Sequence, residues 1–208
     1  MPVPTEPIIK RAAVFVDGQN LFYAAKEAFG SLYPDYDVKT LADKVCASNG
    51  LTAVSIRFYT GVPDAQDNSK WSAFWAKKLL GMSRDGVKVY SRPLKYRNKS
   101  VKLPDGKTHS FLSASEKGVD IRIALDVIRL AISREYDVAV IMSQDQDFSE
   151  VADEVRLIGT EQVRWIKVAS AYPASPACRN GRGINRTDWI KIDRTTYQSC
   201  LDAYNYGI

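Results

Sequence analysis

The chain has 208 residues, and its hydrophobic fraction of 45% is ordinary for a globular protein with a sizeable core. Its three cysteines are an odd number without CxxC or CxxH spacing, which argues against a disulfide framework or a zinc site and favours the cytoplasm. A single histidine gives poor support to chemistry that needs a histidine base or several histidine ligands. The net charge of +5 is moderate, and the apolar runs are far too short to span a membrane.

Apolar runs and helical spacings alternate along most of the chain. Residues 1–10 are expected to form a flexible lead, and residues 11–208 a single domain. We predict strands at residues 12–16, 53–60, 87–91, 138–142 and 162–168 and a short edge strand at 189–192. We predict helices at residues 20–29, 38–48, 69–82, 117–133, 148–158 and 195–202. Strands that alternate with helices indicate βαβ units. The fold class is therefore α/β, with a mainly parallel sheet of about five strands.

Two basic segments interrupt this alternation. An excursion at residues 92–115 carries Arg92, Lys95, Arg97, Lys99 and Lys102, and Pro104-Asp105-Gly106 predicts the turn of a hairpin within it. A C-terminal loop extension at residues 169–208 carries Arg179, Arg182 and Arg186. Cations interleaved with aromatic residues such as Tyr96 suit single-stranded nucleic acid, because phosphates meet charge and bases stack on rings. A solvated loop face explains either segment alone equally well.

Acidic residues follow two of the predicted buried strands. Asp17 comes directly after residues 12–16, and Asp145 and Asp147 follow residues 138–142. Strands of this kind are usually neighbours at the switch point of a doubly wound sheet, where ligands bind, so we expect their acids to meet there. Asp120, in the first turn of the helix before residues 138–142, would join them, with Asn20 alongside.

A cluster of carboxylates is unfavourable without a counter-charge, since like charges raise one another's pKa. Mg²⁺ or Mn²⁺ prefers oxygen ligands and would provide this charge, activate water and stabilise in-line displacement at phosphate. Each acid alone also has an ordinary explanation. Asp147 would cap the helix at Phe148, and Asp120 would be a first-turn acid that interacts with the helix dipole.

Three segments carry a resemblance to a known family: VFVDGQNLF at residues 14–22, KGVDIRIALDV at 117–127 and IMSQDQDFSEV at 141–151. In this order they resemble the NYN domain branch of the PIN-like nuclease superfamily. The resemblance implies a three-layer α/β/α sandwich around a parallel sheet and a metal-dependent ribonuclease or RNA-processing protein. By position it implies that Asp17, Asp120, Asp145 and Asp147 are the catalytic and metal-binding acids. Asn20 would hold a ligand or a water.

The third segment departs from the family pattern at one position. The usual sequence Ser/Thr-Gly-Asp-Ser-Asp-Phe has Gln144 in place of its glycine, so the turn cannot rely on the conformational freedom of glycine. Both acids are kept, and Ser143 would either orient a carboxylate or water or be an ordinary turn serine.

Two charged residues in the second segment, Lys117 and Asp126, each have two alternative roles. Lys117 would neutralise the acidic cluster or contact phosphate. Asp126 follows Asp120 by about 600° of helix rotation, so the two do not share a face. Asp126 would then either support the metal ligands from outside or be a surface charge.

The sequence favours a Mg²⁺- or Mn²⁺-dependent ribonuclease that hydrolyses single-stranded or structured RNA at the carboxyl edge of the sheet. One alternative is a non-catalytic RNA-binding or regulatory module that retains the fold. Another is a nucleotide-binding domain or small-molecule phosphohydrolase, although the chain has neither GxxxxGK[ST] nor GxGxxG. No membrane partner is expected, and the sequence does not identify a protein partner. Trp71, Phe74 and Trp75 are expected in the core, or alternatively at the interface of a homodimer.

Overall fold

The computed structural model of the protein describes residues 4–102, 106, 108–115, 117–204, 206 and 207. Within these residues, one central sheet has six strands in the order β3-β2-β1-β6-β7-β8, and all neighbours pair in parallel. Its strands are β1 (Lys10–Asp17), β2 (Leu51–Val62), β3 (Lys88–Pro93), β6 (Val138–Met142), β7 (Lys167–Pro173) and β8 (Asp188–Ile192). The edge strand predicted at residues 189–192 is therefore a full member of the sheet.

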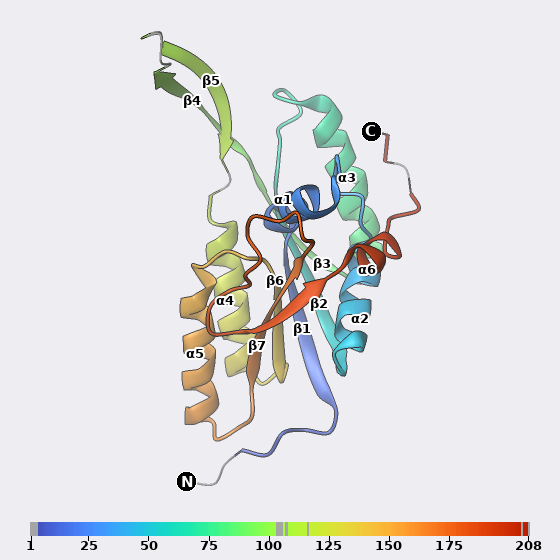
Figure 1. Cartoon of the computed structure of the whole chain (residues 1–208), viewed down its shortest axis with the longest axis vertical. Helices are drawn as coiled ribbons and strands as arrows, with labels where there is room; N and C mark the ends of the chain where they lie inside the picture. Colours follow the sequence, from blue (N-terminus) through green and yellow to red (C-terminus); the bar gives the residue numbers. More distant parts are fainter. Residues whose placement is uncertain (1–3, 103–105, 107, 116, 205, 208) are drawn as a thin grey trace.

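Helices cover both faces of the sheet and complete a three-layer α/β/α sandwich (Figure 1). The helices are α1 (Gly18–Phe29), α2 (Val38–Ser48), α3 (Ser69–Arg84), α4 (Val119–Ile132), α5 (Phe148–Glu161) and α6 (Arg194–Gln198). Helices α1, α2, α3 and α6 share one core cluster, whereas α4 and α5 share the other. Among the described residues, no helix is both long and apolar enough to cross a bilayer.

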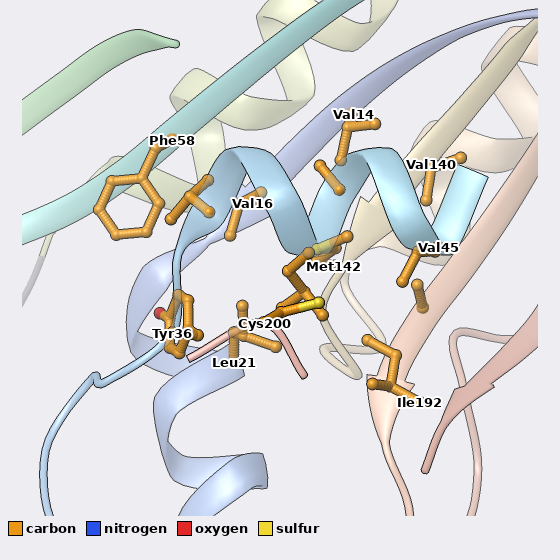
Figure 2. Packing of buried hydrophobic residues seen from close by; sticks show 14 of the residues in the cluster. Val14, Val16, Leu21, Tyr36, Val45, Phe58, Val140, Met142, Ile192 and Cys200 are labelled. Atoms are coloured by element: carbon orange, nitrogen blue, oxygen red, sulfur yellow. The ribbon is translucent and has the colours of Figure 1, made fainter. Parts of the chain in front are cut away.

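The two core clusters follow from the alternation of side chains along the buried strands. In β1, Val14 and Val16 face the α1–α2 layer, whereas Ala13 and Phe15 face α4 and α5. Figure 2 shows the first cluster, in which Val45 of α2 lies over the sheet near Val14 and Val140. All these side chains are buried, and each large one contributes about 1.5–3 kcal/mol relative to exposure. Continuous burial explains why these strands are uniformly apolar.

The predicted hairpin forms a separate two-stranded antiparallel ribbon of β4 (Lys95–Lys102) and β5 (Thr108–Ser115). It projects from the end of the molecule where α4 begins (Figure 1). Of the predicted turn, Pro104 and Asp105 lie outside the described residues, and Gly106 has a φ of 79°. Arg92 joins the two ends of the excursion: its Nη1 donates to the Lys117 carbonyl at 3.3 Å.

The strand predicted at residues 162–168 forms as β7, but its bounds are shifted, since it begins at Lys167 and runs to Pro173. The helix predicted at residues 148–158 continues past Gly159 to Glu161. A Cβ at Gly159 would lie 2.5 Å from Cγ2 of Ile166, so this glycine allows the returning chain to pass close to α5. The long loop after β7 consequently spans residues 174–187 rather than beginning at 169.

Candidate functional site

The predicted neighbours β1 and β6 do pair, and they end at the same level of the sheet. Val16 lies opposite Met142, so Asp17 and Ser143 follow at adjacent strand ends. A cavity of about 480 Å³ opens here between the first turns of α1 and α4, and Asp17, Gln19, Asn20, Lys117, Asp120 and Asp145 line it. The sheet order reverses at this point, as at the ligand-binding crevice of doubly wound folds.

Asp17 is held in the wall of this cavity by two hydrogen bonds. Its Oδ1 accepts from the Asn20 backbone N–H at 3.0 Å and so caps α1, while its Oδ2 accepts from Ser143 Oγ at 3.3 Å. The pKa of Asp17 is raised to about 6, because burial and, to a smaller extent, the charge of Asp145 outweigh the opposing hydrogen bonds from Asn20 and Ser143. Among the described residues, no Lys or Arg forms an ion pair with Asp17.

Ser143 and Asn20 link the acidic loop to the first strand end. The hydroxyl of Ser143 donates to Asp17 and accepts from the Asp145 N–H at 3.1 Å. The side-chain carbonyl of Asn20 accepts from the Gln144 N–H at 3.0 Å. Ser143 thus contacts and orients a carboxylate, which is one of the two roles expected for it. Asn20 fixes the position of the loop that carries Asp145.

Asp145 and Asp147 have different environments although they are two residues apart. Asp145 is half-buried and lines the cavity, and its Oδ1 accepts from the Asp147 N–H at 3.0 Å. Asp147 is exposed, does not line the cavity, and makes no capping hydrogen bond with its side chain. Of the four predicted acids, the structure therefore brings Asp17, Asp120 and Asp145 to one cavity and leaves Asp147 outside it.

Gly118 determines how the chain enters α4 and where Lys117 and Asp120 lie. It has a left-handed φ of 78°, and a Cβ there would lie 2.7 Å from Nη1 of Arg92. Glycine is thus favoured by the backbone conformation, whereas the flexible end of the Arg92 side chain would have to move to admit a Cβ. Asp120, exposed in the first turn of α4, is also well placed for the helix dipole.

Asp126 is not a surface charge, so that alternative is wrong. Its residue is only 4% exposed, and its carboxylate accepts from Tyr59 Oη at 2.9 Å and from Arg122 Nη2 at 2.9 Å. Nη1 of Arg57 lies 3.7 Å from the same group. Arg122 one helical turn before Asp126 was a usable sequence signal, because pairs at this spacing share a helix face. Asp126 does not line the acidic cavity.

The departure at Gln144 has a structural role that the sequence did not reveal. Gln144 is not among the residues with positive φ, so this turn does not need glycine. Its Nε2 donates to the carbonyls of Asn180 at 3.1 Å and Arg182 at 2.7 Å. Gln146 donates to the Gly183 carbonyl at 3.1 Å and accepts from the Asn185 N–H at 3.1 Å. The two glutamines hold the basic loop 174–187 against the acidic loop.

The predicted RNA-binding cations differ in how free their side chains are. Arg179, Arg182 and Lys102 are exposed. Arg186 forms an ion pair with Asp153 of α5, and Arg92 donates to Tyr90 Oη at 2.6 Å as well as to Lys117. The side chains of Lys95, Arg97 and Lys99 lie outside the described part of the structure. Arg179 and Arg182 are thus the free cations that the loop 174–187 presents beside the acidic site.

The donor set of the cavity fits a hydrated Mg²⁺ or Mn²⁺ ion. Three carboxylates line the same cavity, and these ions prefer oxygen donors. Among the described residues, no three acidic, histidine or cysteine side chains converge closely enough to enclose an ion. Mg²⁺ usually keeps several waters and uses one or two carboxylates, so Asp17 and Asp145 would be enough to hold such a hydrated ion.

Comparison with solved structures shows the same fold elsewhere. A protein of unknown function, VPA0982 from Vibrio parahaemolyticus, is 22% identical with a TM-score of 0.53, over 91% of this chain and 97% of that chain. Ribokinase from Giardia lamblia is 8% identical with a TM-score of 0.35, over 83% and 53% of the two chains, which is too distant to carry any argument. No curated protein matches the chain. The profile of the NYN domain matches residues 11–178. The chain therefore belongs to the NYN domain family, part of the PIN-like nuclease superfamily.

Proposed function

We propose that this protein is a ribonuclease that depends on Mg²⁺ or Mn²⁺. The observation that carries the proposal is the cavity at the β1/β6 switch point, which Asp17, Asp120 and Asp145 line and where the pKa of Asp17 is raised, chiefly by burial, to about 6. A carboxylate that is withdrawn from water and has no protein cation favours binding of an external cation.

The side chains have distinct roles in this proposal. Asp17 and Asp145 would hold the ion, and Ser143 links the two residues by donating to the Asp17 carboxylate and accepting from the backbone N–H of Asp145. A bound divalent ion would lower the pKa of a water and stabilise charge that develops on the phosphate. Asp120 would orient the attacking water by accepting its hydrogen bond. Lys117, on the same cavity, would contact a non-bridging phosphate oxygen.

The basic segments would bind the rest of the strand. Exposed Arg179 and Arg182 lie in the loop that Gln144 holds near the acidic loop through the carbonyls of Asn180 and Arg182. The β4–β5 hairpin, with exposed Lys102, would extend this surface along a phosphate backbone. We place this activity in the cytoplasm, as the cysteine content predicts.

A non-catalytic RNA-binding module is the second candidate, and two observations favour it. Asp17 already serves as the cap of α1, and no ready-made set of three metal ligands exists among the described residues. In such a module the acids would be structural, and RNA would be retained by arginine and lysine side chains alone.

Cleavage assays distinguish the two candidates. Labelled single-stranded RNA and DNA are incubated with the wild type, with Asp145→Asn, and with Glu150→Gln, a control in exposed α5 sequence outside the cavity. We expect RNA cleavage with Mn²⁺ or Mg²⁺, none with EDTA, a loss of at least about 100-fold in Asp145→Asn, and no change in Glu150→Gln. RNA binding without cleavage in either metal would establish the binding module instead.

A further inference from the structure

A second pocket lies next to the acidic cavity, on the α1–α3 side of the sheet. Its volume is about 230 Å³, and its walls include Phe22, Pro34, Pro63, Trp71, Trp75 and Leu94. Pockets for drug-sized ligands are about 300–1,000 Å³, so this one suits a single planar ring system. Two proline rings, two indoles and a phenyl ring form flat apolar walls of the kind on which a ring can stack.

The aromatic walls are held in place before any ligand arrives. The Trp75 ring lies 5.9 Å from Phe58 and 5.3 Å from Phe74, and the Trp71 ring lies 5.2 Å from Phe74 at 78°. Phe58 and Phe74 are themselves buried. Trp75 is therefore fixed in the core, whereas Trp71 is half-buried and presents its remaining surface to the pocket.

Polar groups without protein partners border this apolar space. Among the described residues, neither the Trp71 nor the Trp75 indole N–H donates a hydrogen bond to another residue. Asn68 uses its Oδ1 to cap α3, accepting from the Trp71 N–H at 3.2 Å, which leaves its Nδ2 free to donate. Gln19 has an exposed side-chain amide at the same pocket. Amide groups pair well with the polar edges of nucleobases.

The position of Gln19 connects this pocket to the acidic cavity, because its residue lines both. Asp17 lies in the wall of the cavity and the next residue, Gly18, in the wall of the pocket. The cavity and the pocket are therefore neighbours along the backbone at residues 17–19. The pocket has no cation in its wall and would not itself attract a phosphate.

We propose that the aromatic pocket of Phe22, Trp71 and Trp75 binds an unpaired nucleobase of the nucleotide beside the phosphate that occupies the acidic cavity. This inference rests on the proposed function, since it names the part of the RNA strand that the neighbouring site selects. A base can enter such a pocket only when it is unstacked, which makes the pocket a filter for single-stranded or looped RNA.

Binding measurements in EDTA test the pocket without requiring cleavage. A short fluorescently labelled RNA is compared by anisotropy with a strand of equal length made of abasic ribose phosphates, which carries the same charge. We expect the wild type to prefer the RNA by at least about tenfold, as stacking on aromatic side chains predicts. Trp71→Leu should lose most of this preference and bind the abasic strand unchanged.

Two further variants keep the result interpretable. Trp165→Leu, a tryptophan beside Lys167 and away from both sites, is the matched control and should keep the full preference. Leu94→Trp fills the pocket from its half-buried rim and should lose the preference without opening the core, even if Trp71→Leu unfolds. Equal preference for RNA over the abasic strand in the wild type and both pocket variants would overturn the inference. A wild type that binds the two strands with the same affinity, or that binds free AMP but not RNA, would also overturn it.

The same proteins in the cleavage assay separate this inference from the proposed function. Base preference that depends on Trp71 but no hydrolysis in Mn²⁺ supports the pocket and overturns the ribonuclease. Metal-dependent cleavage with unaltered rates in Trp71→Leu and Leu94→Trp supports the ribonuclease and overturns the pocket.

Discussion

Asp126 and Asp17 both have carboxyl groups that the fold withdraws from bulk water, but their oxygens meet different partners. Around Asp126 the protein places the guanidinium groups of Arg122 and Arg57 and the hydroxyl of Tyr59. Around Asp17 it places only neutral donors, the Asn20 N–H and the Ser143 hydroxyl, with a second acid, Asp145, nearby. One carboxylate is neutralised by the chain, and the other is not.

This difference separates a structural acid from a site acid more clearly than burial does. Desolvation penalises both groups, and the ion pairs of Asp126 offset that penalty within the fold. At Asp17 the penalty remains as a pKa raised to about 6, which leaves stabilisation for an external cation to provide. The cavity in front of Asp17 gives such a cation access, whereas Asp126 faces no cavity that contains the other acids.

The largest effect is expected from Asp126→Asn, which removes the carboxylate that the two arginines neutralise. Arg57 is 8% exposed, and its Nε already has no hydrogen-bond partner, so loss of the carboxylate leaves a buried cation uncompensated. We expect the free energy of unfolding to fall by about 3–5 kcal/mol, measured by urea denaturation at pH 7. A loss below about 1 kcal/mol would mean that Tyr59 alone satisfies the group at this position.

Asp17→Asn should act in the opposite direction, because it removes a charge that the folded state destabilises. The folded pKa of about 6 exceeds the ordinary value of 3.8, so protonation favours folding below pH 3.8 and this advantage is lost as the pH rises through 6. At about 1.4 kcal/mol per pH unit the charge costs about 3 kcal/mol, and asparagine caps helices as well as aspartate.

We therefore expect Asp17→Asn to be more stable than the wild type by about 2 kcal/mol at pH 7 in EDTA. This is less than about 3 kcal/mol, because the substitution also removes a favourable charge at the helix N-terminus. The gain should shrink between pH 6 and pH 4. Parallel unfolding curves across this range measure it, with Asp147→Asn, at an exposed acid of the same loop, as the matched control. A variant less stable than wild type at pH 7 would show that the hydrogen bonds at Asp17 outweigh its desolvation.

The sequence predicted the fold well where burial alone determines structure. The uniformly apolar runs of β1 and β6 could only be covered strands, and their neighbouring positions followed from the topology of doubly wound sheets. It misplaced the start of β7, because α5 continues past Gly159, although glycine is a common residue at helix ends. Whether a glycine ends a helix or permits close packing depends on what passes over it, here Ile166, and that contact is tertiary.

The arrangement of the candidate site residues could be predicted only in part, for the same reason. Asp17 and Asp145, which follow β1 and β6, do line one cavity at the edge of the sheet, because strand ends fix their positions. Asp147 and Asp126 depended on helix rotation and on distant partners in β2, which local spacing does not specify. The glutamines at 144 and 146 gave no chemical signal of their own, since their partners are backbone carbonyls and an N–H of a loop 36 or more residues away.

Added metal should sharpen the comparison by stabilising one carboxylate site and not the other. At a Mn²⁺ concentration ten times the dissociation constant, we expect the wild type to gain about 1.4 kcal/mol in the free energy of unfolding, seen as a rise in Tm. Asp17→Asn and Asp145→Asn should lose this gain, and Asp147→Asn should keep it. Loss of the gain in Asp147→Asn would place Asp147 among the ligands, as the family resemblance implies.

The smallest expected effect concerns Arg179 and Arg182, the cations of the loop that Gln144 holds near the acidic loop. Gln144→Ala removes two hydrogen bonds to the loop 174–187, each worth about 1 kcal/mol or less at an exposed position, so unfolding free energy should change little. Amide hydrogen exchange in residues 179–183 should nevertheless become faster, and RNA affinity should fall because Arg179 and Arg182 are no longer held near the acids. Gln66→Ala, at an exposed turn far from this loop in sequence, is the matched control. Unchanged hydrogen exchange and RNA affinity in Gln144→Ala would show that Gln146 holds the loop alone. Gln144, which replaces the family's glycine, would then have no part in placing positive charge near the carboxylate of Asp17.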